Sequence, residues 1–154
     1  MWKKVRNLSF VVLAAALTLS AADAFLGTWN LNVAKSKYSP GPAPKSSTIV
    51  YSQDGDSIVV KTDTVNADGK MGSSTNRYKR DGKEYPYKAV TGEAGTIAVK
   101  SINANTAEAT VKIGSATTMA RTVVSKDGKT FTRTIKGTNA EGKPVNNTVV
   151  FEKQ

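Results

Sequence analysis

The 154-residue sequence contains no cysteine and no histidine. The missing histidine removes the commonest general base, the Ser-His-Asp arrangement and ordinary zinc sites. The missing cysteine removes thiol nucleophiles, iron–sulfur clusters and disulfides, so stability must come from an apolar core and backbone hydrogen bonds. Most aspartates stand in turn dipeptides such as Asp54-Gly55 and Asp127-Gly128, where local backbone bonding accounts for them. We therefore expect neither an enzyme nor a bound cofactor or metal.

Long apolar runs are also scarce, and the one that exists, residues 10–19, follows a basic start at residues 3–6. Ala22-Asp23-Ala24 then matches a small-x-small cleavage site, so the pattern predicts a signal peptide over residues 1–24 with cleavage after Ala24. Ten or so apolar residues are too few to cross about 30 Å of hydrocarbon as a helix. We expect a secreted or periplasmic protein with no transmembrane anchor after cleavage, and a single domain over residues 25–154.

Positive charge is abundant in the expected mature chain. Without the signal, 19 basic side chains stand against 11 acidic ones, a net charge of +8. Such a balance favours anionic partners, including an anionic envelope or glycan surface and carboxylate ligands, but it serves solubility equally. The densest basic and aromatic cluster lies at residues 77–88 and has the composition of a phosphate-binding surface or of a solvated loop. Export argues against an intracellular nucleic acid as partner.

Turn signals divide the chain after Lys45 into segments rich in threonine, valine, isoleucine and aromatic residues. This pattern is typical of a string of β-hairpins, and eight turns predict about nine strands. The expected strands are residues 48–53, 57–63, 74–80, 85–90, 96–102, 107–113, 117–124, 129–136 and 145–153. We predict an all-β fold, an antiparallel up-and-down meander of about 8–9 strands closed as a barrel, with a β-sandwich as the alternative. Three alternating prolines make residues 39–45 a stiff connector before the meander.

Gly27-Thr28-Trp29 stands at the start of the expected mature chain. In a strand, Gly27 and Trp29 share one face, so the indole can enter the apolar side beside a residue without a side chain. The motif resembles the Gly-x-Trp signature of the first strand of calycins, the lipocalins and fatty-acid-binding proteins. That resemblance implies a barrel for small apolar molecules whose closed end is plugged by Trp29. It also implies a basic side chain across the indole, for which Lys153 and Arg133 are the candidates.

The hairpin over residues 117–133 contains two arginines whose placement depends on its loop. A three-residue loop with a bulge would pair Ser125 with Lys129 and make Arg121 face Arg133 on the inner side. Two desolvated guanidinium groups side by side need a compensating anion. We therefore hypothesise that a carboxylate or phosphate lies between the two arginines. An apolar tail would follow residues of the same inner face, namely Met119, Val123, Phe131, Ile135 and Val149.

Two alternatives to that arginine site remain open. A two-residue turn at Asp127-Gly128 would shift the register by one, set Arg133 against Thr122 and place Arg121 on the opposite face. Both arginines could also lie in water near an open rim. The sequence thus favours an exported small β-barrel that binds a small amphipathic or anionic ligand such as a fatty acid. Its alternative is a non-catalytic structural or adhesive envelope protein that uses its basic outer surface.

Overall fold

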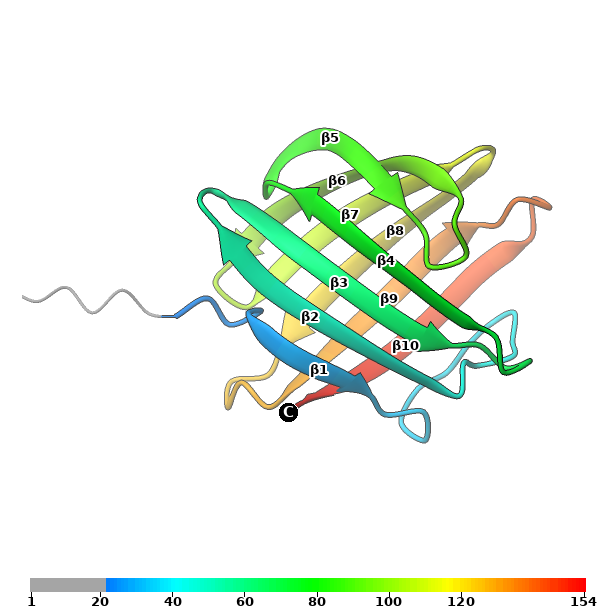
Figure 1. Cartoon of the computed structure of the whole chain (residues 1–154), viewed down its shortest axis with the longest axis horizontal. Coiled ribbons are helices and arrows are strands. Elements are labelled where there is room, and N and C mark those ends of the chain that lie inside the picture. Colours follow the sequence, from blue (N-terminus) through cyan, green and yellow to red (C-terminus); the bar gives the residue numbers. More distant parts are fainter. Residues whose placement is uncertain (1–21) are drawn as a thin grey trace, which may run out of the picture.

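The computed structural model describes residues 22–154 and folds them into ten antiparallel strands (Figure 1). The strands are β1 (Gly27–Leu31), β2 (Ser46–Asp54), β3 (Ser57–Val65), β4 (Met71–Tyr78), β5 (Asp81–Lys88), β6 (Ala94–Asn103), β7 (Thr106–Ile113), β8 (Ala116–Val124), β9 (Thr130–Thr138) and β10 (Pro144–Lys153). The expected signal peptide lies almost wholly outside the described residues. Within residues 22–154, no helix has the length and apolarity needed to cross a membrane.

The ten strands form one sheet in which nearly every strand pairs with its neighbours along the chain. The exceptions are the consecutive strands β4 and β5, which do not pair, and the additional pairing of β1 with β10, from the other end of the chain. This pairing closes the meander, and β4 and β5 remain as the two edges of the sheet (Figure 1). The predicted all-β barrel is therefore confirmed, and the sandwich alternative is not realised. The tenth strand, absent from the nine expected, is β1 itself.

The two edge strands β4 and β5 contact each other without a ladder of backbone hydrogen bonds. The carboxamide of Asn76 on β4 spans this gap: its Nδ2 donates to the carbonyl of Lys88 at 3.0 Å, and its Oδ1 accepts from the Lys88 N–H at 2.8 Å. Near the other end of β4, Gly72 lies so close to the segment that follows β5 that a Cβ on it would come within 2.4 Å of the Val90 carbonyl oxygen. One side chain thus replaces a rung of the ladder, and one missing side chain allows the strands to approach.

One end of the barrel is closed by aromatic side chains. Trp29 and Phe131 are fully buried there, and their ring centroids are 4.8 Å apart. Phe151 stacks on the other side of Phe131 at 4.7 Å. The alternation of the strands explains this cluster, because Phe131 on β9 and Phe151 on β10 are cross-strand partners and point inward together.

The segment between β1 and β2 contains the proline-rich residues 39–45 and runs along β10. Lys37 pairs with Thr148 in an isolated bridge, and the N–H of Asn146 donates to the Ser39 carbonyl at 2.7 Å. Tyr38 packs against the core from this segment. The connector is therefore fastened to the barrel by backbone hydrogen bonds at its start.

Loop length decides the register between β8 and β9. Ser125 pairs with Thr130, through a 2.8 Å hydrogen bond from the Ser125 N–H to the Thr130 carbonyl, so four residues form the loop instead of the three expected. The Asp127 carboxylate supports the extra residue by accepting hydrogen bonds from the Lys129 N–H and the Ser125 hydroxyl. As a result Arg133 lies opposite Thr122, and Arg121 lies opposite Thr134. The prediction that Arg121 faces Arg133 was wrong. The alternative register, shifted by one residue, is correct, but it arises from a four-residue loop and not from the two-residue turn at Asp127-Gly128.

Replacing Asn76 with alanine should lower the free energy of unfolding by about 1–3 kcal/mol, because the N–H and carbonyl of Lys88 lose their partners across the gap. Urea unfolding followed by circular dichroism would measure this loss. The matched control is Thr75→Ala on the exposed face of the same strand, which should change stability by no more than about 0.5 kcal/mol. Equal effects of the two substitutions would show that the amide does not hold the edges together.

Candidate functional site

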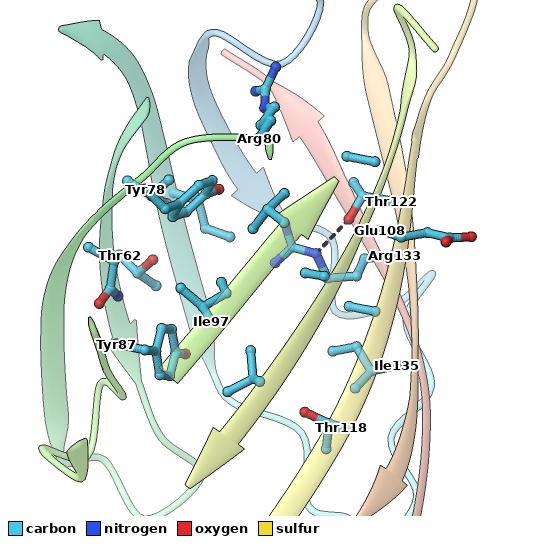
Figure 2. A pocket seen from close by; sticks show the side chains of 18 of the residues that line it. Thr62, Tyr78, Arg80, Tyr87, Ile97, Glu108, Thr118, Thr122, Arg133 and Ile135 are labelled. Carbon is cyan, nitrogen blue, oxygen red and sulfur yellow. Dashed lines mark hydrogen bonds between the residues drawn. The ribbon is translucent and has the colours of Figure 1, made fainter. Parts of the chain in front are cut away.

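An internal cavity of about 290 Å³ lies between the aromatic end of the barrel and its other end. Most of its surface is apolar, with Ile49, Val60, Ile97, Val99, Val111 and Ile135 among the lining residues. The polar groups of the lining include Arg133 from β9, which points into the cavity opposite Tyr78 and Tyr87 (Figure 2). An apolar cavity with a small number of placed polar groups is the usual form of a small-molecule site, for which volumes of about 300–1,000 Å³ are typical.

The guanidinium of Arg133 is held from three directions. Its Nε donates to the Thr122 hydroxyl at 2.9 Å, its Nη2 donates to the Tyr51 hydroxyl at 2.5 Å, and its Cζ lies 5.2 Å from the centroid of the Phe131 ring. Thr122 is in place because it is the cross-strand partner of Arg133, and Phe131 precedes Arg133 by two residues on the same face of β9. The side chain is therefore fixed just above the aromatic end of the cavity.

No carboxylate neutralises Arg133 among the described residues. Glu108 is the one acidic residue that lines the cavity, but its carboxylate points outward, where it forms an ion pair with Arg121 at 2.5 Å (Figure 2). Burial by itself lowers the pKa of Arg133, but the neighbouring Tyr51 and Tyr78 outweigh it and leave this pKa raised. The cavity thus contains a permanent positive charge whose hydrogen-bond partners are neutral hydroxyl groups.

Tyr78 and Tyr87, which face this charge, have raised pKa values. Burial is the main cause that raises the pKa of Tyr78 and of Tyr87, and the positive charge of Arg133 offsets part of this effect. Both phenols therefore stay protonated at neutral pH and can donate hydrogen bonds to an anion in the cavity.

A second guanidinium, that of Arg80, lines the cavity at its aromatic end (Figure 2). It forms an ion pair with Asp23, with 2.6 Å between Nη1 and Oδ2, and its Cζ lies 4.6 Å from the centroid of the Phe25 ring. Unlike Arg133, Arg80 is therefore neutralised by a carboxylate of the chain itself.

The three residues predicted for the closed end lie together. Trp29 is fully buried, and the Lys153 ammonium lies 5.0 Å from the centroid of its indole ring. Lys153 is the cross-strand partner of Trp29, so the pairing of β1 with β10 brings it there. Gly27 has φ of +119°, and a Cβ on it would come within 2.9 Å of the Lys153 Cε. The backbone at Gly27 thus leaves the room that the lysine stem occupies.

The predicted ligand-binding residues divide between the two faces of the barrel wall. Phe131, Arg133 and Ile135 lie inside, with Phe131 in the core and the other two in the cavity wall. Met119 and Val123 were expected inside but are 62% and 41% exposed. The one-residue shift in register explains this error, because it moves Met119, Arg121 and Val123 together to the outer face.

The basic and aromatic cluster at residues 77–88 is also split by alternation. Tyr78 and Tyr87 face the cavity, whereas Arg77 and Lys79 point outward and form ion pairs with Asp54 and Asp56. The cluster is therefore not one continuous surface of positive charge.

Several residues of the site were not expected from the sequence. These are Tyr51, Tyr78, Tyr87, Asn76, Thr122 and Arg80. Tyr85 and Tyr87 stand two residues apart, a spacing that places both on one face of a strand. This spacing could have predicted that the two tyrosines face the same side of the barrel wall. The contact of Tyr51 with Arg133 joins β2 to β9, and no local pattern shows which strands meet across a barrel.

No protein-family model matches the sequence, and neither does any curated protein. Solved structures do match. A fatty acid binding protein of Schistosoma mansoni in complex with arachidonic acid superposes with a TM-score of 0.66 at 17% identity, over 85% of this chain and 96% of that one. Zebrafish ileal bile acid-binding protein complexed with cholic acid gives a TM-score of 0.58 at 18% identity, over 85% and 99% of the two chains. The extracellular fatty acid binding protein As-p18 gives 0.59 at 16% identity, over 86% and 97%.

The fold is that of a fatty-acid-binding-protein-like calycin barrel. At these identities the likeness extends to the architecture alone, and it confirms the resemblance read from Gly27 and Trp29. This barrel thus has a known architecture and carries Thr122, Tyr51, Tyr78 and Tyr87 around Arg133.

Raising the pH above about 10 should destabilise the protein, because Tyr78 is buried and its pKa is raised in the folded state. Its contribution to stability is fully present below the pKa of a free tyrosine and is lost as the pH rises toward the folded-state value. Urea unfolding at several pH values between about 9 and about 11 would measure the decline. Tyr78→Phe should make that decline shallower, and an unchanged slope would contradict the assignment to Tyr78.

Proposed function

We propose that this calycin barrel is an exported carrier of a long-chain fatty acid or a similar amphipathic monoanion, with the carboxylate bound at Arg133. One observation carries the proposal: a guanidinium without a counter-ion among the described residues faces a largely apolar cavity. A carboxylate matches the planar fork of donors on an arginine and forms charge-assisted hydrogen bonds with it. Tyr78 and Tyr87 lie opposite and offer further hydroxyl donors.

The cavity also indicates how such a ligand is oriented. Arg133 lies next to the aromatic floor formed by Trp29 and Phe131, and the cavity wall continues past Ile135 and Thr118 toward the other end of the barrel (Figure 2). The head group therefore enters first, and the hydrocarbon tail lies along the aliphatic wall. Arachidonic acid and cholic acid, the ligands of two of the similar structures, are both carboxylic acids with a large apolar body.

A cavity favours the carrier over a structural or adhesive domain, because such a domain would fill its inner face with its own side chains. Export is part of the proposal and is supported by the basic start, apolar run and small-x-small motif at residues 3–24. The extracellular protein As-p18 shows that this architecture occurs outside cells.

Replacing Arg133 with methionine should weaken the binding of palmitic acid about 10- to 100-fold, as expected for the loss of hydrogen bonds to a charged group. Isothermal titration calorimetry on delipidated protein would measure the change. Arg121→Met is the matched control, because Arg121 lies outside the barrel and its loss should leave the affinity unchanged within about twofold. Near-ultraviolet circular dichroism would establish that both variants are folded.

A second ligand separates the role of charge from that of the apolar wall. Hexadecanol has the same chain length as palmitic acid but no carboxylate, so wild type should bind it more weakly than the acid, and Arg133→Met should bind both alike. Equal affinity of wild type and Arg133→Met for palmitic acid would refute binding of the carboxylate at Arg133. Failure of folded wild type to bind either ligand would refute the carrier function.

A further inference from the structure

The residues just before β1 are part of the folded barrel. Asp23 accepts a hydrogen bond at Oδ1 from the Phe25 N–H at 2.9 Å, and its Oδ2 forms the 2.6 Å ion pair with Nη1 of Arg80. The side chains of this pair are only 25% and 14% exposed. The carbonyl of Asp23 also accepts from the Leu26 N–H at 3.2 Å, so residues 23–26 form a turn at the closed end of the barrel.

Phe25 is the centre of this turn. It is 3% exposed, its carbonyl accepts a 2.8 Å hydrogen bond from the Trp29 indole, and its ring lies beneath the Arg80 guanidinium. Its N–H is satisfied by Asp23. The backbone nitrogen of Phe25 is therefore a buried group in a place built for a neutral amide.

Two small-x-small motifs overlap just upstream of this turn. Ala22-Asp23-Ala24 directs cleavage after Ala24, and Ser20-Ala21-Ala22 directs it after Ala22. The two products differ by one aspartate and one alanine, and this difference decides what remains beside Arg80.

Cleavage after Ala24 would damage the closed end in two ways. It would remove Asp23, the only carboxylate within ion-pair distance of Arg80 in the described part of the chain. It would also turn the backbone nitrogen of Phe25 into an ammonium group, which would be buried near the guanidinium of Arg80. A buried charge without a partner is strongly destabilising, and two like charges side by side are more so. Cleavage after Ala22 avoids both effects, because Asp23 stays and the new ammonium group forms on the half-buried Asp23 and not on the buried Phe25.

We propose that the exported protein is processed after Ala22, so that Asp23 is its first residue and its carboxylate is the built-in counter-ion of Arg80. This placement replaces the cleavage after Ala24 expected from the sequence. It rests on the export included in the proposed function and not on the ligand. It leaves Arg133 as the guanidinium of the cavity that a ligand neutralises.

Intact-mass spectrometry of the full chain, expressed with its own leader in a bacterium and recovered from the periplasm or medium, tests the site of cleavage. The mass of Asp23–Gln154 is the expected result. The mass of Phe25–Gln154, or of any other processed product, would overturn the inference but leave export intact. Recovery of the uncleaved chain from the cells alone would refute export and this inference with it, whereas ligand binding at Arg133 would remain to be judged by its own titration.

Urea unfolding of the Asp23–Gln154 protein and of its Asp23→Asn variant tests the counter-ion independently of processing. Asparagine keeps the size of the side chain and its acceptor for the Phe25 N–H, but it lacks the charge. We expect a lower unfolding midpoint for Asp23→Asn, and a still lower one for a chain that starts at Phe25. An unchanged midpoint in both would overturn the role of Asp23.

Arg80→Met supplies the matched control for this pair. In the Arg80→Met background there is no guanidinium to neutralise, so adding Asp23→Asn should change the midpoint much less than it does in wild type. The same loss in both backgrounds would show that Asp23 acts through its backbone turn and not as a counter-ion, and would overturn the proposal.

Discussion

Just above its closed end, the barrel holds the guanidinium of Arg133 inside its wall, and no carboxylate of residues 22–154 neutralises it. Desolvating such a charge is costly, and hydroxyl dipoles and an aromatic face compensate for only part of the cost. Thr122 and Tyr51 satisfy two of its nitrogen atoms, and Phe131 lies against it. The remaining donor capacity faces the cavity. An anion that enters the cavity thus gains charge-assisted hydrogen bonds in surroundings of low polarity, where such bonds are strong.

The number of interior charges depends on a single residue in a loop. The turns that start at Asn66, Ala89 and Asn139 each close over three residues, as shown by hydrogen bonds to Lys70, Glu93 and Lys143. The turn after Ser125 has one residue more. Since side chains alternate along a strand, a three-residue loop there would have placed Arg121 inside with Arg133. The longer loop instead sends Arg121 outward to Glu108, where water and a carboxylate both stabilise it.

The parts of this structure that could be predicted are those determined by local sequence. Turn dipeptides and alternating segments predicted nine of the ten strands, and Gly27 with Trp29 predicted the closed end. The expected strands 74–80 and 85–90 were displaced, because Asp81-Gly82 begins β5 instead of forming the turn before it. The register of the β8–β9 hairpin could not be decided from the sequence, because Ser-Lys-Asp-Gly-Lys is compatible with loops of three and of four residues. The two loops place opposite sets of β8 side chains inside the barrel. Contacts across the barrel could not be predicted from local patterns, because the residues that meet are far apart in the sequence. Tyr51 and Arg133 are 82 positions apart, and Asp23 and Arg80 are 57 apart. Asp23 moreover lies within the predicted signal peptide, a segment that cleavage removes, so no contact with the folded domain was expected for it.

The two guanidinium groups of the cavity differ in whether a carboxylate of the described chain neutralises them, and this difference bears on the charge of a ligand. Arg80, next to the aromatic end, is neutralised by Asp23. Arg133 also lines the cavity and has no such partner among the described residues. A ligand with one negative charge therefore balances the cavity, and a second negative charge would find no free cation and would meet the carboxylate of Asp23 near Arg80. The aliphatic wall beyond Arg133 offers no further charge to a polar tail. These constraints support the proposed ligand, a single acidic head on an apolar body.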